Sequence, residues 1–210
     1  MTVVIFPAMA APRLHAAAAA LLLAAATACA GTRESPERPS PRPVSRYPHT
    51  QADVRFMTNM IGHHAQALEM AALAPANGAS PAVRRLAERI EAGQQDEIAS
   101  MRQWLSDRGE PLPDAHHSMH VHAMPGMLSE AQMKELEAAR GAAFDRLFLT
   151  YMIQHHRGAV AMVKQLYGTP GAAQDDTVFK FADDVGVDQT TEIARMERML
   201  DALPAGEPAS

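Results

Sequence analysis

Apolar residues recur at helical spacing in four long segments of the chain. The segments run from about residue 50 to 74, 80 to 108, 141 to 167 and 176 to 203. Each ends at a proline or glycine, and the second begins with Ser80 as N-cap and Pro81 at the first helical position, where both are favoured. A shorter helix is expected after Ser129, because Ser129-x-x-Gln132 is a capping-box pattern. The pattern therefore predicts an all-α fold.

The four long segments form two related pairs. Met60-Ile61-x-His63-His64 in the first segment returns in the third as Met152-Ile153-x-His155-His156. The second and fourth segments also match, with Gln94, Glu97, Ile98, Met101 and Leu105 corresponding to Gln189, Glu192, Ile193, Met196 and Leu200. The repeated unit is thus a helical hairpin. One hairpin alone would leave its apolar stripe exposed, so the sequence predicts a four-helix bundle made of two duplicated hairpins.

Polar residues interrupt the apolar faces of these helices. A helical wheel places His64 and His156 near the centre of the apolar face, and His63 and His155 near its edge. Gln94 shares a stripe with apolar neighbours on the second segment. Burying such groups unpaired costs several kcal/mol, so they must pair with each other, with water or with a metal ion.

Two interpretations of these polar residues remain open. One is a hydrogen-bonded core network that joins His64 to Glu97 and His156 to Glu192. The other is a metal site, because imidazole nitrogen and thioether sulfur together suit copper, above all Cu(I). In a mixed form, His64 and His156 are structural while His63 and His155 bind metal. The candidate ligands on the helices are His63, His64, His155, His156, Met60, Met152, Glu97, Met101, Glu192 and Met196.

A second group of candidate ligands lies in the predicted loop between the hairpins. It consists of His116, His117, His120 and His122, with Met119, Met124 and Met127 close by. Core packing does not account for such a cluster in a loop, and short His-rich tracts commonly bind metal. A loop without a function stays open as the alternative. The usual zinc signatures, a cysteine pair or His-Glu-x-x-His, are absent from the sequence.

The N-terminal region is typical of an exported bacterial protein. Arg13 and His15 precede an Ala/Leu run over residues 16–28, which has the length of a signal peptide core and is short for a membrane span. Cys29, flanked by small residues, resembles a lipoprotein cleavage site and is a candidate lipid anchor. We expect a signal peptide over 1–29, a Pro-rich linker over 30–48 and the bundle over 49–204, in a periplasmic or membrane-anchored lipoprotein.

Charge and motifs exclude several functions. The formal net charge is -5 and no basic stripe is visible, so nucleic acid is not an expected partner. No set of nucleophile, base and orienting group appears, nor a Gly-rich phosphate loop, so an enzyme is not expected. A di-metal oxidoreductase is disfavoured, because Glu-x-x-His is missing near the histidines.

Three stretches of sequence carry a family resemblance. They are Phe56-Met57-x-x-Met60-Ile61-x-His63-His64-x-x-Ala67-Leu68-x-Met70-Ala71, Gln94-x-x-Glu97-Ile98-x-x-Met101-x-x-Trp104-Leu105 and Phe144-Asp145-x-x-Phe148-Leu149-x-x-Met152-Ile153-x-His155-His156-x-Gly158-Ala159. Together they resemble the domain of unknown function (DUF) 305 family over roughly residues 49–203.

The resemblance implies a ferritin-like four-helix bundle, usually exported in bacteria, with some members that bind copper and are linked to copper tolerance. On this basis the expected function is copper binding, as Cu(I) or Cu(II), for buffering, tolerance or delivery. A copper transporter or chaperone is then the expected partner. A metal-free structural or protein-interaction bundle is the alternative.

Overall fold

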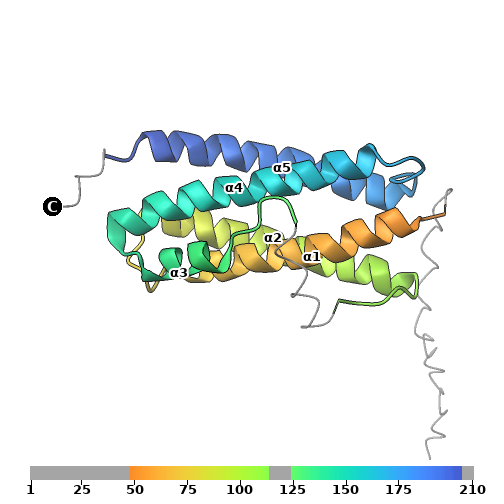
Figure 1. Ribbon diagram of the computed structural model, residues 1–210, viewed down its shortest axis with the longest axis horizontal. Coiled ribbons are helices and arrows are strands. Elements are labelled where there is room, and N and C mark those ends of the chain that lie inside the picture. Colours follow the sequence, from red (N-terminus) through yellow and green to blue (C-terminus); the bar gives the residue numbers. More distant parts are fainter. Residues whose placement is uncertain (1–47, 114–123, 205–210) are drawn as a thin grey trace, which may run out of the picture. The chain divides into compact units, whose positions relative to one another are not determined.

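The computed structural model describes residues 48–113 and 124–204, and within these ranges it contains helices and connecting loops but no strand (Figure 1). Four long helices, α1 (Gln51–Ala72), α2 (Pro81–Asp107), α4 (Gly141–Tyr167) and α5 (Asp176–Asp201), accompany the short α3 (Glu130–Ala138). The predicted all-α fold is confirmed, and the helix limits agree with the sequence pattern to within a few residues. The predicted signal peptide and nearly all of the linker lie outside the described residues.

Side-chain caps set the starts of the helices. The Thr50 hydroxyl accepts the Asp53 N–H at 3.3 Å, while Asp53 Oδ2 accepts the Thr50 N–H at 2.7 Å, which completes a capping box at α1. Ser80 caps α2 as the sequence predicts. Ser129 and Gln132 form the predicted capping box at α3. Local sequence is therefore sufficient to place these helix starts.

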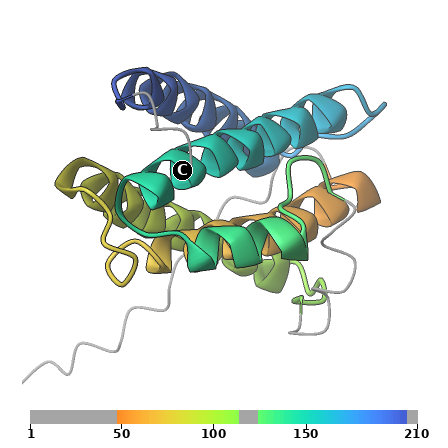
Figure 2. The same ribbon diagram turned by 60° about the vertical axis from the view of Figure 1, so that its left-hand side comes forward.

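The long helices pair into two hairpins, as the duplication predicts. α2 packs along α1 and α5 along α4, and the hairpins meet chiefly through α1 and α4 (Figures 1 and 2). The beginning of α1 shares an apolar cluster with the end of α4, and the end of α2 shares it with the beginning of α5. α1 therefore runs antiparallel to α4, and α2 runs antiparallel to α5. α2 and α5 do not pack closely against each other.

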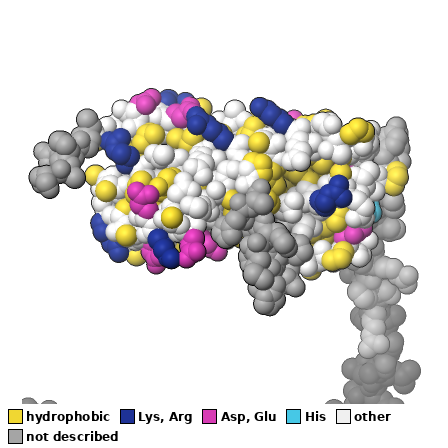
Figure 3. All heavy atoms as spheres, in the orientation of Figure 1, with side chains coloured by type: hydrophobic (Ala, Val, Ile, Leu, Met, Phe, Trp, Pro, Cys, Tyr) yellow, Lys and Arg dark blue, Asp and Glu magenta, His cyan; other side chains and the backbone are white. Residues whose placement is uncertain are grey.

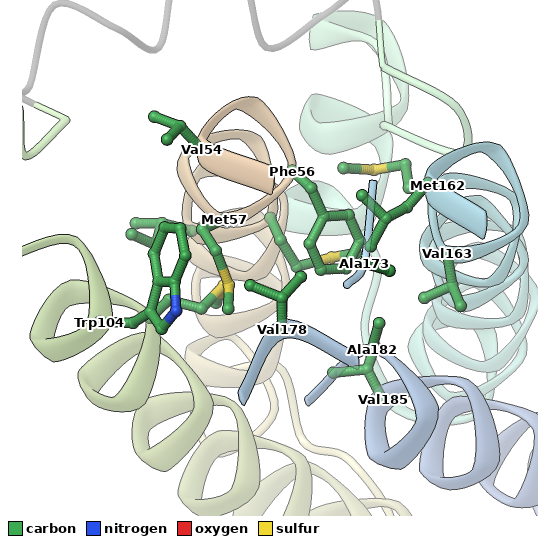
Figure 4. Close-up of a cluster of buried hydrophobic side chains, with 14 of the residues drawn as sticks. Val54, Phe56, Met57, Trp104, Met162, Val163, Ala173, Val178, Ala182 and Val185 are labelled. Atoms are coloured by element: carbon green, nitrogen blue, oxygen red, sulfur yellow. The ribbon is translucent and has the colours of Figure 1, made fainter. Parts of the chain in front are cut away.

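The hydrophobic core is divided into two clusters. The first cluster gathers side chains such as Met57, Trp104 and Val178 between the helices (Figure 4). The second contains Leu86 and Phe148 at the other end of the bundle. Between the two clusters each long helix contributes polar side chains at the same level. We call these eight residues the polar layer: His63, His64, Gln94, Glu97, His155, His156, Gln189 and Glu192.

Two buried aspartates tie each hairpin to the turn of the other. Asp53 Oδ1 accepts the N–H of Ala173, in the turn between α4 and α5, at 2.7 Å. The duplicate residue, Asp145, accepts the N–H of Ser80, in the turn between α1 and α2, at 3.1 and 3.3 Å through its two oxygens. Both aspartates are buried, so these bonds fix the distance between the hairpins from both ends.

Replacing Asp53 by Ala is expected to lower the free energy of unfolding by about 2 kcal/mol, because it removes a cap and leaves the buried Ala173 N–H without an acceptor. Thr50→Ala removes only the cap and should cost about 1 kcal/mol. Urea unfolding of the two variants measures the difference. Equal losses would show that the tie to Ala173 contributes nothing.

The surface carries both charge signs. On the face shown in Figure 3, Lys and Arg side chains are interspersed with Asp and Glu rather than gathered into one patch. Within the described ranges, no helix combines the length and the apolar character needed to cross a membrane. The basic stripe that a nucleic-acid-binding surface requires is thus not seen on this face.

Candidate functional site

All four histidines of the repeated motif lie in the polar layer and are completely buried. The rings of His63 and His155 meet across the seam between α1 and α4, with their centroids 3.9 Å apart. His64 and His156 flank them at 6.3 and 6.2 Å from their respective neighbours. The helical wheel placed His63 and His155 near the edge of the apolar face, yet both are fully buried. That edge becomes interior because α1 and α4 pack against each other there.

Two of the imidazoles are paired with carboxylates across their own hairpins. His64 Nε2 lies 2.5 Å from Glu97 Oε2, and His156 Nε2 lies 2.7 Å from Glu192 Oε2. These are the pairs expected from a hydrogen-bonded network, and the duplication places one in each hairpin. The glutamates are not fully enclosed, since their side chains are 20% and 23% exposed. The polar layer therefore reaches the surface through its carboxylates.

The central pair of imidazoles bonds to backbone carbonyls instead. His155 Nε2 donates to the carbonyl oxygen of His63 at 2.9 Å, and His63 Nε2 donates to that of Pro125 at 3.0 Å. Strict twofold symmetry would pair His63 with the carbonyl of His155. The segment between the hairpins thus supplies an acceptor that breaks the symmetry of the duplication.

The hydrogen bonds define the tautomer of every ring. Each Nε2 faces an oxygen of a carbonyl or an ionised carboxylate, and such oxygens only accept, so Nε2 carries the proton. In a neutral ring the lone pair then lies on Nδ1. All four Nδ1 atoms are buried and have no hydrogen-bond partner. The polar layer therefore contains four buried Nδ1 atoms without a hydrogen bond, and each carries an unshared lone pair when its ring is neutral.

Burial keeps the central rings neutral. Desolvation, reinforced by the nearby His64, lowers the pKa of His63 to about 3, although its bond to Pro125 acts in the opposite direction. Desolvation and the adjacent His63 ring likewise hold the pKa of His155 well below 6.5. Both rings are thus in the neutral form that binds metal ions at neutral pH.

The four candidate thioethers are also fully buried, on both sides of the polar layer. Met60 and Met101 belong to the first apolar cluster, and Met152 and Met196 to the second. Among the described residues, no three side chains of His, Cys, Asp or Glu lie together in a way that could hold a metal ion. A metal ion in this layer would therefore need thioether sulfur as well as imidazole nitrogen.

The segment just before α3 is held tightly over the central pair. The side chain of Gln66 donates to the Leu128 carbonyl at 3.1 Å and accepts the Leu128 N–H at 2.8 Å. A Cβ on Gly158 would come within 2.0 Å of the Pro125 carbonyl oxygen, so only glycine allows this approach. His116, His117, His120 and His122 precede this segment and lie outside the described residues.

Sequence reasoning assigned no role to Gln66 or Gly158. The signal for Gly158 was present, because a glycine inside a long helix costs about 1 kcal/mol relative to alanine and commonly marks a close approach of another backbone. Trp104 packs in the first apolar cluster and also donates its indole N–H to Asp175 at 3.3 Å.

Comparison with known proteins identifies the relatives of this chain. The model of the family described as domain of unknown function (DUF305) matches residues 53–200. A DUF305 fragment from Deinococcus radiodurans is 33% identical, covers 74% of this chain and 99% of its own, and superposes with a TM-score of 0.65. A DUF305 protein from Streptomyces coelicolor, proposed to be secreted, is 30% identical over 76% of this chain and 98% of its own, with a TM-score of 0.64.

A third structure, CopM in its Cu(I)-bound form, is 28% identical over 71% of this chain and 95% of its own, with a TM-score of 0.56. CopM structures in Cu(II)-bound, Ag-bound and apo forms match similarly. No protein of curated function gives a significant match.

Proposed function

Because the chain belongs to the DUF305 family, we propose that it is an exported metal-binding protein that holds copper through imidazole nitrogen and thioether sulfur. The observation that carries the proposal is the set of four buried Nδ1 atoms in the polar layer that have no hydrogen-bond partner. Histidines that bind metal usually donate their other ring N–H to a carboxylate or a backbone carbonyl. Every histidine of the layer makes such a bond.

The kinds of ligand atom in the polar layer favour Cu(I) over other metal ions. Buried thioethers lie on both sides of the imidazoles, whereas the two carboxylates are engaged with His64 and His156. Imidazole with thioether favours Cu(I), and Ag(I) shares that preference for soft ligands. His63, His155, Met60 and Met152 are therefore the ligands we assign first. Glu97 and Glu192 act by orienting His64 and His156.

Similar proteins support the same ion and compartment. CopM is known in Cu(I)-, Cu(II)- and Ag-bound forms. The relative from Streptomyces coelicolor is proposed to be secreted, in agreement with the leader-like residues 1–29 of this chain. We propose export, with Cys29 as a lipid anchor, and a role in copper buffering, tolerance or delivery to a transporter or chaperone. Catalysis is not part of the proposal.

A metal-free bundle is the second candidate, and one observation favours it. Each imidazole already has a hydrogen bond, and the described residues contain no group of three His, Cys, Asp or Glu side chains that could hold an ion. In that case the layer would serve only to align the two hairpins. The two functions differ in whether an added ion stabilises the fold.

Copper titration of the full chain distinguishes them. The test uses a quadruple variant, His63→Gln, His64→Gln, His155→Gln and His156→Gln. Each glutamine keeps an N–H donor in place of Nε2 but has no atom that replaces Nδ1 as a metal ligand. We expect the affinity for Cu(I), measured anaerobically against a competing chelator, to fall at least about 100-fold. The wild type should also melt at a higher temperature with Cu(I) or Ag(I) than without it.

Two control variants interpret this titration. His49→Gln removes a histidine that is bonded to Glu110 outside the polar layer, and its affinity should be unchanged. Replacing His116, His117, His120 and His122 by Gln tests the loop separately. Loss of binding in the loop variant alone, with the quadruple core variant unaffected and still folded by circular dichroism, would contradict the assignment of the core ligands.

A further inference from the structure

A cleft of about 510 Å³ separates α2 from α5. It exists because the hairpins meet through α1 and α4, while α2 and α5 do not pack closely against each other. Its wall includes Glu97 and Glu192, the exposed side of the polar layer. Cavities of this volume are typical of sites for small organic ligands.

The cleft has one acidic and one basic end. Glu97 and Asp188 lie toward the first apolar cluster, because they are followed by Met101 on α2 and preceded by Val185 on α5. The basic residues lie toward the second cluster, beside Ile90 and Met196. They are Arg89, Arg195 and Arg198. Since α2 and α5 run antiparallel, the three arginines belong to one end of the cleft and Glu97 and Asp188 to the other, with Glu192 between them along α5.

Two buried amides between these ends lack partners. Gln94 and Gln189 both line the cleft and are each only 2% exposed. Neither Nε2 nor Oε1 of Gln94 has a hydrogen-bond partner, and Oε1 of Gln189 has none. A buried polar group without a partner destabilises the fold, so its presence needs an explanation. A ligand that both accepts and donates hydrogen bonds would satisfy these atoms.

A metal ion does not fit this cleft. No group of three His, Cys, Asp or Glu side chains in the described ranges could hold one, so the carboxylates do not converge on a single point. Burial and the nearby Glu97 and Glu192 raise the pKa of Asp188, which shows that negative charge accumulates at the acidic end and would attract a cation. The opposite end offers guanidinium groups, which recognise carboxylates.

We propose that the cleft between α2 and α5 binds a small zwitterion of the size of an amino acid or a dipeptide. Its ammonium group lies beside Glu97 and Asp188, its carboxylate lies beside the three arginines, and its polar middle bonds to Gln94 and Gln189. The site shares Glu97 and Glu192 with the imidazole pairs but uses none of the imidazoles, so it does not depend on the proposed copper binding. The variant His63→Gln with His155→Gln should therefore still bind the zwitterion.

The first test uses the metal-free full chain and a panel of the twenty free amino acids and L-alanyl-L-alanine, measured by isothermal titration calorimetry. At least one probe should bind with a Kd below about 1 mM. Its N-acetylated and C-amidated forms, which lose one charge each, should bind at least about 10-fold more weakly. Absence of binding by the whole panel, or equal binding of the capped forms, would overturn the proposal.

Variants of the cleft supply the second test. Two variants should each lower the affinity for the probe at least about 10-fold. One is Asp188→Asn, and the other is the triple variant Arg89→Gln, Arg195→Gln and Arg198→Gln. Asp183→Asn and Arg84→Gln are matched controls, because these residues lie on the same helices outside the cleft lining. Equal weakening by the controls would reveal a general effect of surface charge and contradict the proposal.

Gln94→Leu separates a binding role from a structural one. Removal of an unpaired buried amide should raise the melting temperature of the ligand-free protein by about 2–4 °C and abolish binding of the probe. A lower melting temperature, or unchanged binding, would show that Gln94 does not serve the ligand. A divalent ion such as Zn²⁺ that binds alone and requires Asp188 would also overturn the proposal.

Discussion

The metal-free protein is expected to lose at least about 2.5 kcal/mol of its free energy of unfolding as the pH falls from 6.5 to about 4.5. His63 and His155 are the cause. Both rings are wholly buried, and the pKa of each lies far below the value of 6.5 for an exposed imidazole, at about 3 for His63. The loss is a large part of the 5–15 kcal/mol that is typical of natural domains.

The sign follows from proton uptake. Below pH 6.5 the two histidines take up protons in the unfolded chain but not in the folded one, so acid favours unfolding. Their contribution is complete above pH 6.5 and is lost progressively down to about pH 3 for His63. A histidine that stays neutral in the folded protein contributes about 1.4 kcal/mol per pH unit in this window, which gives about 2.5 kcal/mol for His63 over two units. The lowered pKa of His155 adds a loss of the same sign.

Urea unfolding in the presence of a metal chelator, repeated across this pH range, measures the effect. Carboxylates also titrate there, so the informative quantity is the difference in slope between the wild type and the variant His63→Gln with His155→Gln. The double variant should show the shallower slope. If it kept the wild-type slope, the central imidazoles would not be the groups that respond to acid.

Replacing Gly158 by Ala is expected to lower the free energy of unfolding by about 3 kcal/mol, although alanine is the better helix former by about 1 kcal/mol. The new Cβ would lie 2.0 Å from the Pro125 carbonyl oxygen and 2.7 Å from the Gly126 Cα, and both are backbone atoms. The segment must therefore move away from α4. That movement removes the acceptor of the His63 N–H, which is buried and has no substitute.

Gly93→Ala is the matched control for this prediction. Gly93 also lies inside a long helix, but a Cβ there would meet nothing within 4 Å. The substitution should therefore raise stability by up to about 1 kcal/mol. Denaturant unfolding of both variants gives the comparison, and a stabilising effect of Gly158→Ala would show that the segment yields without cost.

Local signals in the sequence were sufficient for the helices and for the duplication. The caps at Ser80 and Ser129 and the helical periodicity depend on neighbours a few residues away, so no knowledge of the tertiary structure was needed. The sequence also indicated the pairs of His64 with Glu97 and of His156 with Glu192, because the two members of each pair lie on facing helices of the same hairpin.

The arrangement at the seam could not be derived in the same way. Whether the edge of an apolar face is buried depends on which helix covers it, and the contact of α1 with α4 joins residues far apart in sequence. The bond from His63 to Pro125 further requires the segment between the hairpins to cross the seam at Gly158. The cleft likewise exists because the hairpins meet through α1 and α4 and not through α2 and α5, which the pattern of a single helix does not record.

The unequal bonding of the central pair bears on how this architecture could arise. Two identical, unconnected hairpins would present two equivalent rings, and neither could take an acceptor that the other lacked. Here one ring depends on a carbonyl that only the connecting segment provides. Fusion of the gene copies therefore gave more than a covalent link: it created a chemical difference between the halves. After that step, a return to an assembly of separate hairpins would leave one imidazole without its bond.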